Sequence, residues 1–388
     1  MTDVVIVSAV RTAVARGKAD GSLAGLHPVD VSSAVMHAAV ERAGVDPASI
    51  EDVQWGCAMP EASQGLNHAR LAWLRAGYPV ETSAATINRF CSSGLQAVAY
   101  GAQAIMSGMG DTILTGGIEM MSQVPMSGYN ARLSPELTES MIGMGFTAER
   151  VAKQWDISRE AQDRFACDSQ QHAVRAIATG AFREQIVPVP VKRYSWKGAE
   201  KQVSEAVFDT DETPRAETTI EGLAKLRPAF VPTGTVTAGN ASPYSDGAAA
   251  VLLMSADRAT ELGLTPLARF VSFATAGVDP DIMGVGPIKA VPKALKRAGL
   301  SLKDLKLIEF NEAFAAQALA VIKELDMDTS IVNVNGGAIA LGHPLGATGA
   351  KLTTQLVHEL RRRGGGHGMV TMCIGGGMGA AGIFEVFP

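Results

Sequence analysis

The chain has 388 residues, of which 47% are hydrophobic and 19% are charged, and its formal net charge is −5. This length and balance predict a large interior shared by two or more domains, and they exclude extensive disorder. The acidic charge argues against a general binder of nucleic acid or anionic membranes, so an anionic ligand must be met by a local group.

The stretch MTDVVIVSAVRTAV lacks the basic start, long apolar run and cleavage site of a secretory signal, and we expect it to form a first β-strand. No stretch of the sequence reaches the roughly 18 uninterrupted apolar residues of a membrane helix. These features favour a cytoplasmic protein that does not enter a membrane.

Cysteine usage points to the same compartment. The four cysteines are far apart and form no CxxC pair: Cys57, Cys91, Cys167 and Cys373. A zinc ribbon or a disulfide framework is therefore poorly supported, and reduced thiols in a reducing compartment fit better. We expect no metal site.

The chain contains an internal repeat. ERAGVDPASIEDVQWGCA from Glu41 matches KRAGLSLKDLKLIEFNEA from Lys296 without a gap, at an offset of 255 residues. DVVIVSAVRT similarly corresponds to LARFVSFATAG, and TILTGG to GMVTMCIGGG. Each half reads strand, helix, strand, helix, strand, which is typical of a parallel sheet covered by helices. We predict an α/β protein built from two similar halves.

A stretch of different character separates the halves. It contains SQVPMSGYNARLSP, a helical hairpin expected over 146–180, and the charged VKRYSWKGAEKQVSEAVFDTDETPRAE. Its size favours a loop domain that folds over a site, and a solvated surface flap is the alternative. GTVTAGNASPYSDGAAAVLLMS should then rejoin the sheet of the first half. The predicted units are a first half (1–117 and 233–264), an inserted loop domain (118–232) and a second half (265–388).

The segment TINRFCSSGLQAV places Cys91 at the start of an expected helix, because Leu95, Val98, Ala102 and Ile105 follow at helical spacing. Backbone N–H groups and the helix dipole at such a position are expected to lower the thiol pKa and to make the sulfur nucleophilic. A buried structural cysteine is the alternative, since free cysteine packs like a small hydrophobe.

Two other small-residue loops carry candidate chemistry. In NGGAIALGHPLGATGA, His343 lies between glycine and proline at a helix start, where an imidazole could accept a thiol proton or donate to an oxyanion. In MCIGGGMGAAGIFEV, Cys373 ends an apolar strand before three glycines with bare N–H groups. Neither a dinucleotide fingerprint nor a P-loop is present. Because the repeat makes the turns of Cys91 and His343 equivalent, pseudo-twofold packing should bring them together.

Asn311 and Phe314 follow the strand of the second half that matches QWGCA. Asparagine at this place could cap a helix.

The blocks NRFCSSGLQAV, GTVTAGNASPYSDGAAA, NEAFA, NVNGGAIALGHPLGATGA and CIGGGMGAA resemble those of the thiolase family, in that family's order and along essentially the whole chain. The resemblance implies a five-layered fold of two βαβαβαββ halves with a loop domain inserted in the first.

The resemblance also implies a reaction. Cys91 would attack the ketone carbon of a 3-ketoacyl-CoA and carry the acyl group, while Cys373 would protonate the leaving enolate of acetyl-CoA. His343 would activate Cys91 and bind the thioester oxygen, with Asn311 holding a water. The N–H groups of Cys91 and Gly375 would form a second oxyanion hole.

Coenzyme A is implied as a substrate, with no covalently bound cofactor. The family pattern places Ser242, Met144 and Phe314 at the CoA and substrate site, and Arg215 near the adenine. NRFCSSGLQAVA and the region from Met144 to Ala173 resemble the degradative 3-ketoacyl-CoA thiolases of fatty-acid β-oxidation (acetyl-CoA C-acyltransferases). Gly143 stands where the biosynthetic acetoacetyl-CoA type (acetyl-CoA C-acetyltransferase) carries a histidine, so strict short-chain specificity is not expected.

Three alternatives stay open beside this interpretation: a biosynthetic acetoacetyl-CoA thiolase, a decarboxylating ketoacyl synthase and a non-catalytic acyl-CoA or lipid-binding protein of the same fold. The CIGGG cysteine argues against the synthase, which typically uses two histidines. Apolar faces and the resemblance favour a homodimer or homotetramer. The sequence leaves open the acyl length, the direction, and the existence of a hydratase–dehydrogenase partner.

Overall fold

The computed structural model describes residues 2–126, 128–129, 142–198 and 200–388. The sheet of the first half runs in the hydrogen-bonded order β4-β3-β5-β9-β1. Its elements are β1 (Val4–Thr12), α1 (Pro28–Ala43), β3 (Asp52–Cys57), α2 (His68–Arg75), β4 (Ser83–Ile87), α3 (Ser93–Met106), β5 (Thr112–Met120) and β9 (Ser245–Ser255).

The second half repeats this order, β11-β12-β13-β10. The place of β4 is taken by Val332, which forms an isolated parallel bridge with Ile308. The elements are β10 (Ala268–Gly277), α8 (Gly286–Ala298), β11 (Leu305–Phe310), α9 (Ala315–Leu325), α10 (Ala338–Leu341), α11 (Leu345–Arg362), β12 (Gly366–Ile374) and β13 (Met378–Val386).

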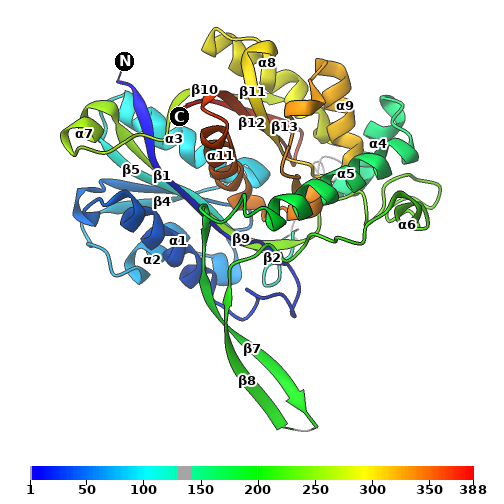
Figure 1. Ribbon diagram of the computed structural model, residues 1–388, viewed down its shortest axis with the longest axis horizontal. Coiled ribbons are helices and arrows are strands. Elements are labelled where there is room, and N and C mark those ends of the chain that lie inside the picture. Colours follow the sequence, from blue (N-terminus) through cyan, green and yellow to red (C-terminus); the bar gives the residue numbers. More distant parts are fainter. Residues whose placement is uncertain (1, 127, 130–141, 199) are drawn as a thin grey trace.

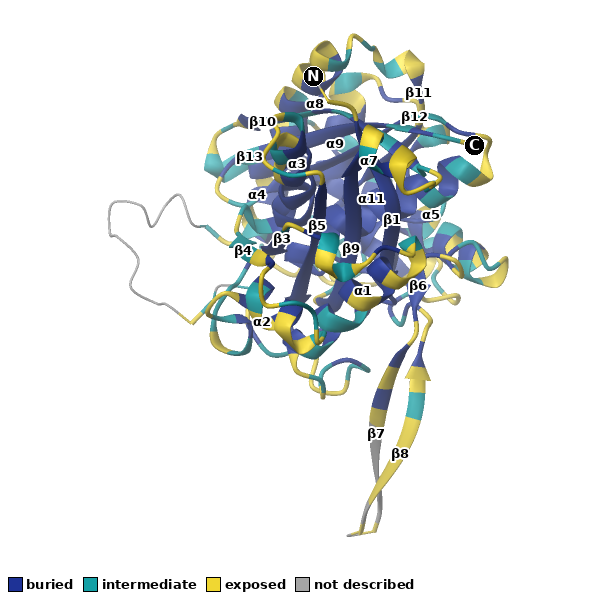
Figure 2. Cartoon of the chain, turned by 90° about the vertical axis from the view of Figure 1, so that its left-hand side faces the viewer, coloured by how far each residue is buried: buried dark blue, intermediate teal, exposed yellow. Residues whose placement is uncertain are grey.

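The elements stack in five layers (Figure 1). Helices α3 and α11 form the central layer between the two sheets, α1 and α2 cover the outer face of the first sheet, and α8 and α9 cover that of the second. The two sheets meet where β1 pairs antiparallel with β10, Val5 opposite Arg269. The strands between the helical layers are almost wholly buried (Figure 2).

The sheets are mixed, whereas the repeated strand–helix pattern predicted parallel ones. Strand β3 pairs parallel with β4 and β5, as β11 does with β12, but β9 lies antiparallel between β5 and β1, and β13 lies antiparallel between β12 and β10. Helical crossovers return the chain in the same direction, whereas β13 follows β12 through a tight turn that reverses it. The expectation that the segment after the insertion rejoins the first sheet is confirmed by β9.

The repeated RAG sequence ends α1 and α8 in the same way. Gly44 and Gly299 follow the two helices with φ values of 66° and 69°, a left-handed conformation that glycine adopts without the steric cost of a Cβ. Their N–H groups bond back to carbonyls of the last helical turn. Similar sequence therefore produces similar helix ends in both halves.

Small residues let the two central helices touch. A Cβ added at Gly94 of α3 would lie 2.8 Å from the backbone nitrogen of Ala350 of α11, and one at Gly349 would lie 2.1 Å from that of Leu95. Buried apolar side chains of both helices pack into the core between the sheets, and this burial stabilises the layer. The close crossing brings the N-terminal ends of α3 and α11 together.

The helical hairpin expected over 146–180 is present as α4 (Met144–Gln154) and α5 (Arg159–Ala178). Both helices pack on the second half, α4 against α9 and α5 against α9 and α10. The segment SQVPMSGYNARLSP lies partly outside the described residues. The remaining elements are β2 (Ala15–Arg16), β6 (Ile186–Val187), β7 (Val189–Lys197), β8 (Glu200–Phe208), α6 (Ile220–Ala224) and α7 (Ala256–Glu261).

Strands β7 and β8 form the charged part of the insertion, and their hairpin projects away from the body (Figures 1 and 2). The predicted unit boundaries near 117, 232 and 264 stay predictions. Among the described residues, no helix combines the length and the hydropathy that crossing a membrane requires.

Candidate active site

The segment around Cys91 is a tight turn held by side chains. Residues Phe90–Ser92 form one 3₁₀ turn that leads into α3. Asn88 Oδ1 accepts a hydrogen bond from the Phe90 N–H at 2.8 Å, while Asn88 Nδ2 donates to the Ala58 carbonyl at 3.1 Å. Ser93 Oγ donates to the Phe90 carbonyl at 2.7 Å. These bonds fix the Cys91 backbone at the end of β4, where the strand gives way to the helix.

Phe90 adopts a φ of 43°, in the left-handed region that bulky residues rarely occupy. Such a conformation costs on the order of 1–3 kcal/mol and persists where the surroundings hold it. Here the Asn88 and Ser93 hydrogen bonds hold it, and Cys91 follows directly. No feature of the sequence indicated this turn, since its residue is not a glycine.

His343 lies just before α11, and three contacts fix it. Its N–H donates to Ser245 Oγ of β9 at 3.0 Å. Ring atom Nδ1 is 2.6 Å from Thr348 Oγ1, and Nε2 is 3.2 Å from Asn311 Nδ2. The preceding Gly342 has a φ of 82°, and a Cβ there would lie 2.4 Å from Ser245 Oγ. The imidazole is buried between the two halves.

Asn311 follows β11, and its own N–H donates to the Thr371 carbonyl of β12 at 3.0 Å. Its Nδ2 meets His343 as described, which brings the two predicted site residues into direct contact. Its Oδ1 is buried without a hydrogen-bond partner among the described residues. Buried acceptors of this kind are usually satisfied by a water or a ligand.

Cys373 lies near the end of β12 and is fully buried beside Phe314 and Met144. Gly375 follows two residues later, and its backbone N–H donates to the Cys91 thiol. The turn of Cys91 packs against both β12 and the first turn of α11. The turn of Cys91 therefore lies against the start of the His343 helix, an approach that the internal repeat predicted, and Cys373 and Gly375 lie close to the same turn.

Burial dominates the electrostatics of the site. Loss of solvent raises the pKa of Cys91 to about 11, although the N–H groups of Gly375 and of Cys91 itself act to lower it. Burial lowers the pKa of His343 to about 3, with the positive charge of Lys351 as a second cause. Burial also raises the pKa of Cys373, and its closeness to Cys91 adds to the effect.

The sequence-based expectation of a lowered thiol pKa was therefore wrong for the ligand-free site. The helix start does supply N–H donors, but desolvation outweighs them because the sulfur is enclosed. The site at neutral pH contains a neutral Cys91 thiol and a neutral His343 imidazole.

Three of the expected substrate-binding residues lie together beside the thiols. The N–H of Ser242 donates to the Ala313 carbonyl at 3.0 Å, next to Phe314. Met144 packs into the cluster that contains Cys373 and Phe314. A Cβ at Gly375 would lie 3.9 Å from the Met144 sulfur.

An aromatic row leads from the surface toward this group. Phe146 lies at the start of α4 and is 47% exposed. Its ring centroid is 6.1 Å from that of Phe230. Phe230 lies 6.2 Å from Phe314, whose exposed fraction is only 9%. An open surface pocket of about 390 Å³ adjoins the outer end of the row. The three rings thus form one continuous apolar contact from the surface to the buried Phe314.

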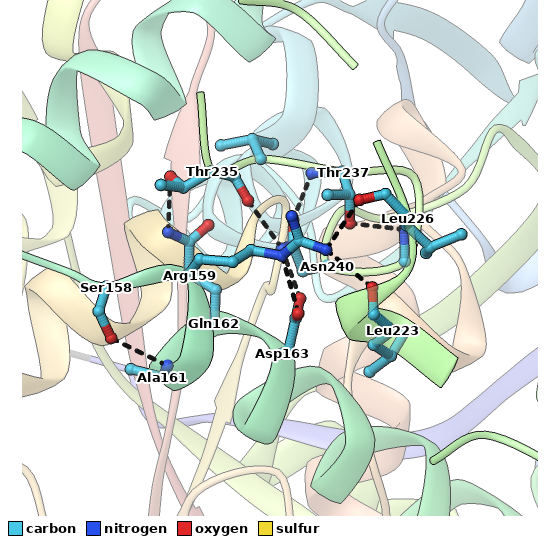
Figure 3. A network of polar contacts seen from close by, with 12 residues as sticks. Ser158, Arg159, Ala161, Gln162, Asp163, Leu223, Leu226, Thr235, Thr237 and Asn240 are labelled. Carbon is cyan, nitrogen blue, oxygen red and sulfur yellow. Dashed lines mark hydrogen bonds and ion pairs between the residues drawn. The ribbon is translucent and has the colours of Figure 1, made fainter. Parts of the chain in front are cut away.

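A buried polar network fixes the segment that carries Ser242 (Figure 3). Asn240 Nδ2 donates to Asp163 Oδ1 of α5 at 2.9 Å, and Asn240 Oδ1 accepts from the Thr237 N–H at 2.7 Å. Arg159 Nε donates to Asp163 Oδ2 at 2.7 Å. Helix α5 of the insertion thus fixes the segment that carries Ser242.

The comparisons with known proteins agree with this arrangement. The model of the thiolase N-terminal domain matches residues 4–257, and that of the thiolase C-terminal domain matches residues 264–386. The chain belongs to the thiolase family. The expected five-layered thiolase fold is confirmed by the strand orders and by the solved structures described next.

Similar thiolases carry two kinds of name. A 3-ketoacyl-CoA thiolase of Bacillus subtilis is 53% identical over 100% of both chains, and an acetyl-CoA acetyltransferase of Pseudomonas aeruginosa is 49% identical over 98% of each. The crystal structure of the Bacillus anthracis acetyl-CoA acetyltransferase has a TM-score of 0.90 and that of human mitochondrial 3-ketoacyl-CoA thiolase 0.89. Each of these two structures is 42% identical in sequence to this chain, and the match covers 100% of this chain and 99% of the chain in the solved structure.

Among the described contacts, Arg215 has none with the other predicted site residues. Arg215 is exposed, and its N–H donates to Gln170 Oε1 of α5 at 2.8 Å. This loop lies beside α5, which the network of Asp163 also uses. The assignment of Arg215 to the adenine end of CoA stays a prediction.

Sequence reasoning missed a buried carboxylate that supports the thiolase site. Glu119, at the end of β5, accepts hydrogen bonds from the N–H groups of Ala58 and of Gly346 in the first turn of α11, at 2.8 and 2.9 Å, and from Gln64 Nε2 at 2.8 Å. Burial raises the pKa of Glu119, and these donors oppose the rise. An acidic residue inside an otherwise apolar strand, two positions beyond TILTGG, was the available signal.

Proposed function

We propose that this thiolase catalyses the reversible, CoA-dependent cleavage of a 3-ketoacyl-CoA into a shortened acyl-CoA and acetyl-CoA, with the acyl group carried on Cys91. The observation that carries the proposal is the enclosure of two thiols, Cys91 and Cys373, with Cys91 packed against Leu345 in the first turn of the helix that His343 precedes. The 53% identical relative named 3-ketoacyl-CoA thiolase supports it.

The first step activates the nucleophile. His343 takes the proton of the Cys91 thiol, and the sulfur attacks the ketone carbon of the substrate. The carbon–carbon bond then breaks, which leaves a thioester on Cys91 and the enolate of acetyl-CoA. Because one thioester replaces another when CoA later accepts the acyl group, the sequence can run in either direction.

Cys373 is the proposed acid for the leaving enolate. Burial raises the pKa of Cys373, so the side chain holds its proton at neutral pH and can give it to the carbanionic carbon. In the reverse direction the thiolate of Cys373 would take that proton back from acetyl-CoA. In the forward direction the CoA thiol then gives its proton to the Cys373 thiolate and takes the acyl group from Cys91, and His343 returns its proton to the Cys91 sulfur.

Two sets of donors would stabilise the oxygen charges that develop. The N–H groups of Gly375 and Cys91 converge on the Cys91 sulfur, which supports their role as an oxyanion hole for the acyl-enzyme carbonyl. On the other side, a water on the unpartnered Asn311 Oδ1 and the protonated His343 would face the thioester oxygen.

Coenzyme A enters this proposal as a substrate, without a bound cofactor. We place its pantetheine arm along the aromatic row, with Met144, Ser242 and Phe314 at the inner end. Arg215 would meet the adenine end. This apolar route can hold an uncharged arm while the nucleotide stays near the surface.

A second candidate activity is the condensation of two acetyl-CoA molecules by an acetyl-CoA C-acetyltransferase. It is favoured by the several relatives of that name, among them those of Pseudomonas aeruginosa and Cupriavidus necator. Gly143 argues for the broader specificity, because it leaves the space beside Phe146 without a side chain.

A chain-length profile tests the proposal. Purified protein is supplied with free CoA and with acetoacetyl-CoA, 3-ketohexanoyl-CoA or 3-ketodecanoyl-CoA, and cleavage is followed as loss of the enolate absorbance. We expect cleavage of all three, with kcat/KM at least as high for the longer substrates. Cleavage of acetoacetyl-CoA alone would favour the second candidate, and no cleavage of any would contradict both.

We further propose a homodimer or homotetramer in the cytoplasm. Strand β4 lies at a sheet edge, and nearby Leu66 and Val80 are 88% and 65% exposed. An open strand edge beside apolar side chains is typical of a surface that a second copy covers. Light scattering on the purified protein measures the assembly, and copurification tests for a hydratase–dehydrogenase partner.

A further inference from the structure

The imidazole of His343 is held at both nitrogens by buried groups. Its Nδ1 lies 2.6 Å from Thr348 Oγ1, and its Nε2 lies 3.2 Å from Asn311 Nδ2. Thr348 Oγ1 is in turn 2.9 Å from the Pro344 carbonyl oxygen, one helical turn back. A neutral imidazole carries one proton, so these three contacts together restrict where that proton lies.

Counting hydrogens gives one arrangement that satisfies all three contacts. The Pro344 carbonyl can only accept, so the single hydroxyl proton of Thr348 is needed there. Thr348 Oγ1 must then accept from Nδ1–H, and Nε2 is left with a lone pair that accepts from Asn311 Nδ2. Each close pair of atoms then contains one hydrogen.

The opposite tautomer leaves an uncompensated contact. If Nε2 carried the proton, Thr348 would have to donate to Nδ1, and two oxygens would face each other at 2.9 Å without a hydrogen between them. The Asn311 amide would also have to turn, so that Oδ1 gains the partner it now lacks and the NH₂ group loses its own; the contact of Thr348 with the Pro344 carbonyl therefore decides between the tautomers. Two buried oxygens held this close without a hydrogen between them repel each other, which disfavours this tautomer.

Other threonines of α11 show that the hydroxyl bond to the carbonyl is regular. Thr353 Oγ1 donates to the Gly349 carbonyl at 2.8 Å, and Thr354 Oγ1 donates to that of Ala350 at 3.0 Å. This bond to the carbonyl four residues back is the common one for threonine inside a helix. Thr348 differs from Thr353 because its hydroxyl oxygen also lies within hydrogen-bond distance of a histidine nitrogen, Nδ1 of His343.

We propose that Thr348 is a positioning residue that holds His343 as the Nδ1–H tautomer, so that Nε2 presents a lone pair to receive the proton of Cys91. The inference rests on the proposed function, in which His343 is the base for that thiol. In the transfer, the S–H bond breaks and the Nε2–H bond forms, with the electron pair left on sulfur. Fixing one imidazole nitrogen through a second group is how proteins set the role of the other.

The assignment orders the two roles of His343. Before proton transfer, Nε2 can only accept, and its hydrogen bond from Asn311 Nδ2 is long at 3.2 Å, so the Cys91 S–H replaces the amide there when the proton moves. After transfer, Nε2–H becomes a donor and can no longer accept from the asparagine, so it is free to bind the thioester oxygen. The low pKa that burial gives His343 agrees with a neutral starting state.

Two readouts on three variants test the inference. In protein carrying ¹⁵N-histidine, NMR distinguishes a protonated from an unprotonated ring nitrogen, and the signals of His343 are those lost in His343→Asn. The second readout is the rate at which iodoacetamide alkylates Cys91. The variants are Thr348→Val, Thr348→Ser and the matched control Thr353→Val, which removes the same hydroxyl–carbonyl bond from the same helix.

We expect the wild type to show Nδ1–H and a bare Nε2. Thr348→Val should populate the other tautomer and slow alkylation by about 10-fold, the factor equivalent to about 1.4 kcal/mol, while Thr348→Ser and Thr353→Val stay at wild-type values. A protonated Nε2 in the wild type, or equal effects of Thr348→Val and Thr353→Val, would overturn the inference. The tautomer of His343 in the wild type decides the inference even if a variant fails to fold. Because it is measured without substrate, this result is independent of the proposed reaction.

Discussion

Gly349 of α11 lies so close to Leu95 of α3 that a Cβ at the glycine would be 2.1 Å from the leucine backbone nitrogen. This contact between the halves determines how near the starts of the two central helices approach. Cys91 precedes one helix and His343 the other, so the site depends on a glycine that has no chemical role in it.

Substitution of this glycine should damage both stability and activity. Gly349→Ala forces the central helices apart, and overpacking of this kind costs about 1–3 kcal/mol. Denaturant unfolding and the thiolysis rate measure the two effects. Gly25→Ala is the control, because a Cβ there meets nothing within 4 Å. Equal behaviour of the two variants would show that the helix contact does not control the site.

A buried ion pair should hold the inserted domain to the first half. Arg11 of β1 and Asp211 are fully buried and 2.7 Å apart, and Asp211 also accepts from the Val14 N–H at 2.8 Å. Asp211→Ala leaves the arginine charge buried without its partner, so unfolding free energy should fall by about 3–5 kcal/mol.

Asp30→Ala is the matched control for that pair. Asp30 lies 2.5 Å from Arg75, but both side chains are largely exposed, so its removal should cost about 0–1 kcal/mol. Comparable losses in the two variants would mean that burial does not decide the contribution of the pair.

The pH dependence of Cys91 alkylation should follow a raised thiol pKa. With a pKa of about 11 in the ligand-free protein, the thiolate fraction rises about tenfold per pH unit between pH 7 and 10. His343, with a pKa of about 3, adds no inflection between pH 5 and 9. Iodoacetamide rates over this range measure the profile. A plateau near neutral pH would instead indicate a standing thiolate–imidazolium pair.

Cys373→Ser should separate the half-reactions. The proposed proton transfer of Cys373 concerns the acetyl carbon, so acyl transfer from an acyl-CoA to Cys91 should survive. Thiolysis and condensation should fall by roughly 10²–10⁴, the range typical of general acid–base groups. Rapid-quench measurement of acyl-enzyme beside steady-state turnover compares the steps, and equal loss of both would contradict the division of roles.

The sequence predicted those features that follow from local pattern and from the repeat. The RAG helix ends and the meeting of Cys91 with the His343 helix follow from residues that recur in both halves, and the helical hairpin of the insertion follows from its own local pattern. Strand direction did not follow, because the same alternating pattern fits a mixed sheet once a turn rather than a helix joins two strands.

The electrostatics of the site could not be predicted from the sequence. The helix start of Cys91 was visible, but the enclosure that raises its thiol pKa depends on packing from the other half. The left-handed Phe90 and the bond of Thr348 to His343 join residues that are close in sequence, but no recognised sequence pattern indicates them. Local sequence shows which groups are present, and packing decides their protonation.

The most direct test of the account is to locate the acyl group. The protein is incubated with an acyl-CoA without free CoA, quenched in acid, digested and mapped by peptide mass spectrometry. The account predicts one acyl group on the peptide that contains Cys91, and its loss in Cys91→Ala. Acylation of Cys373 or Cys167 in place of Cys91 would contradict it.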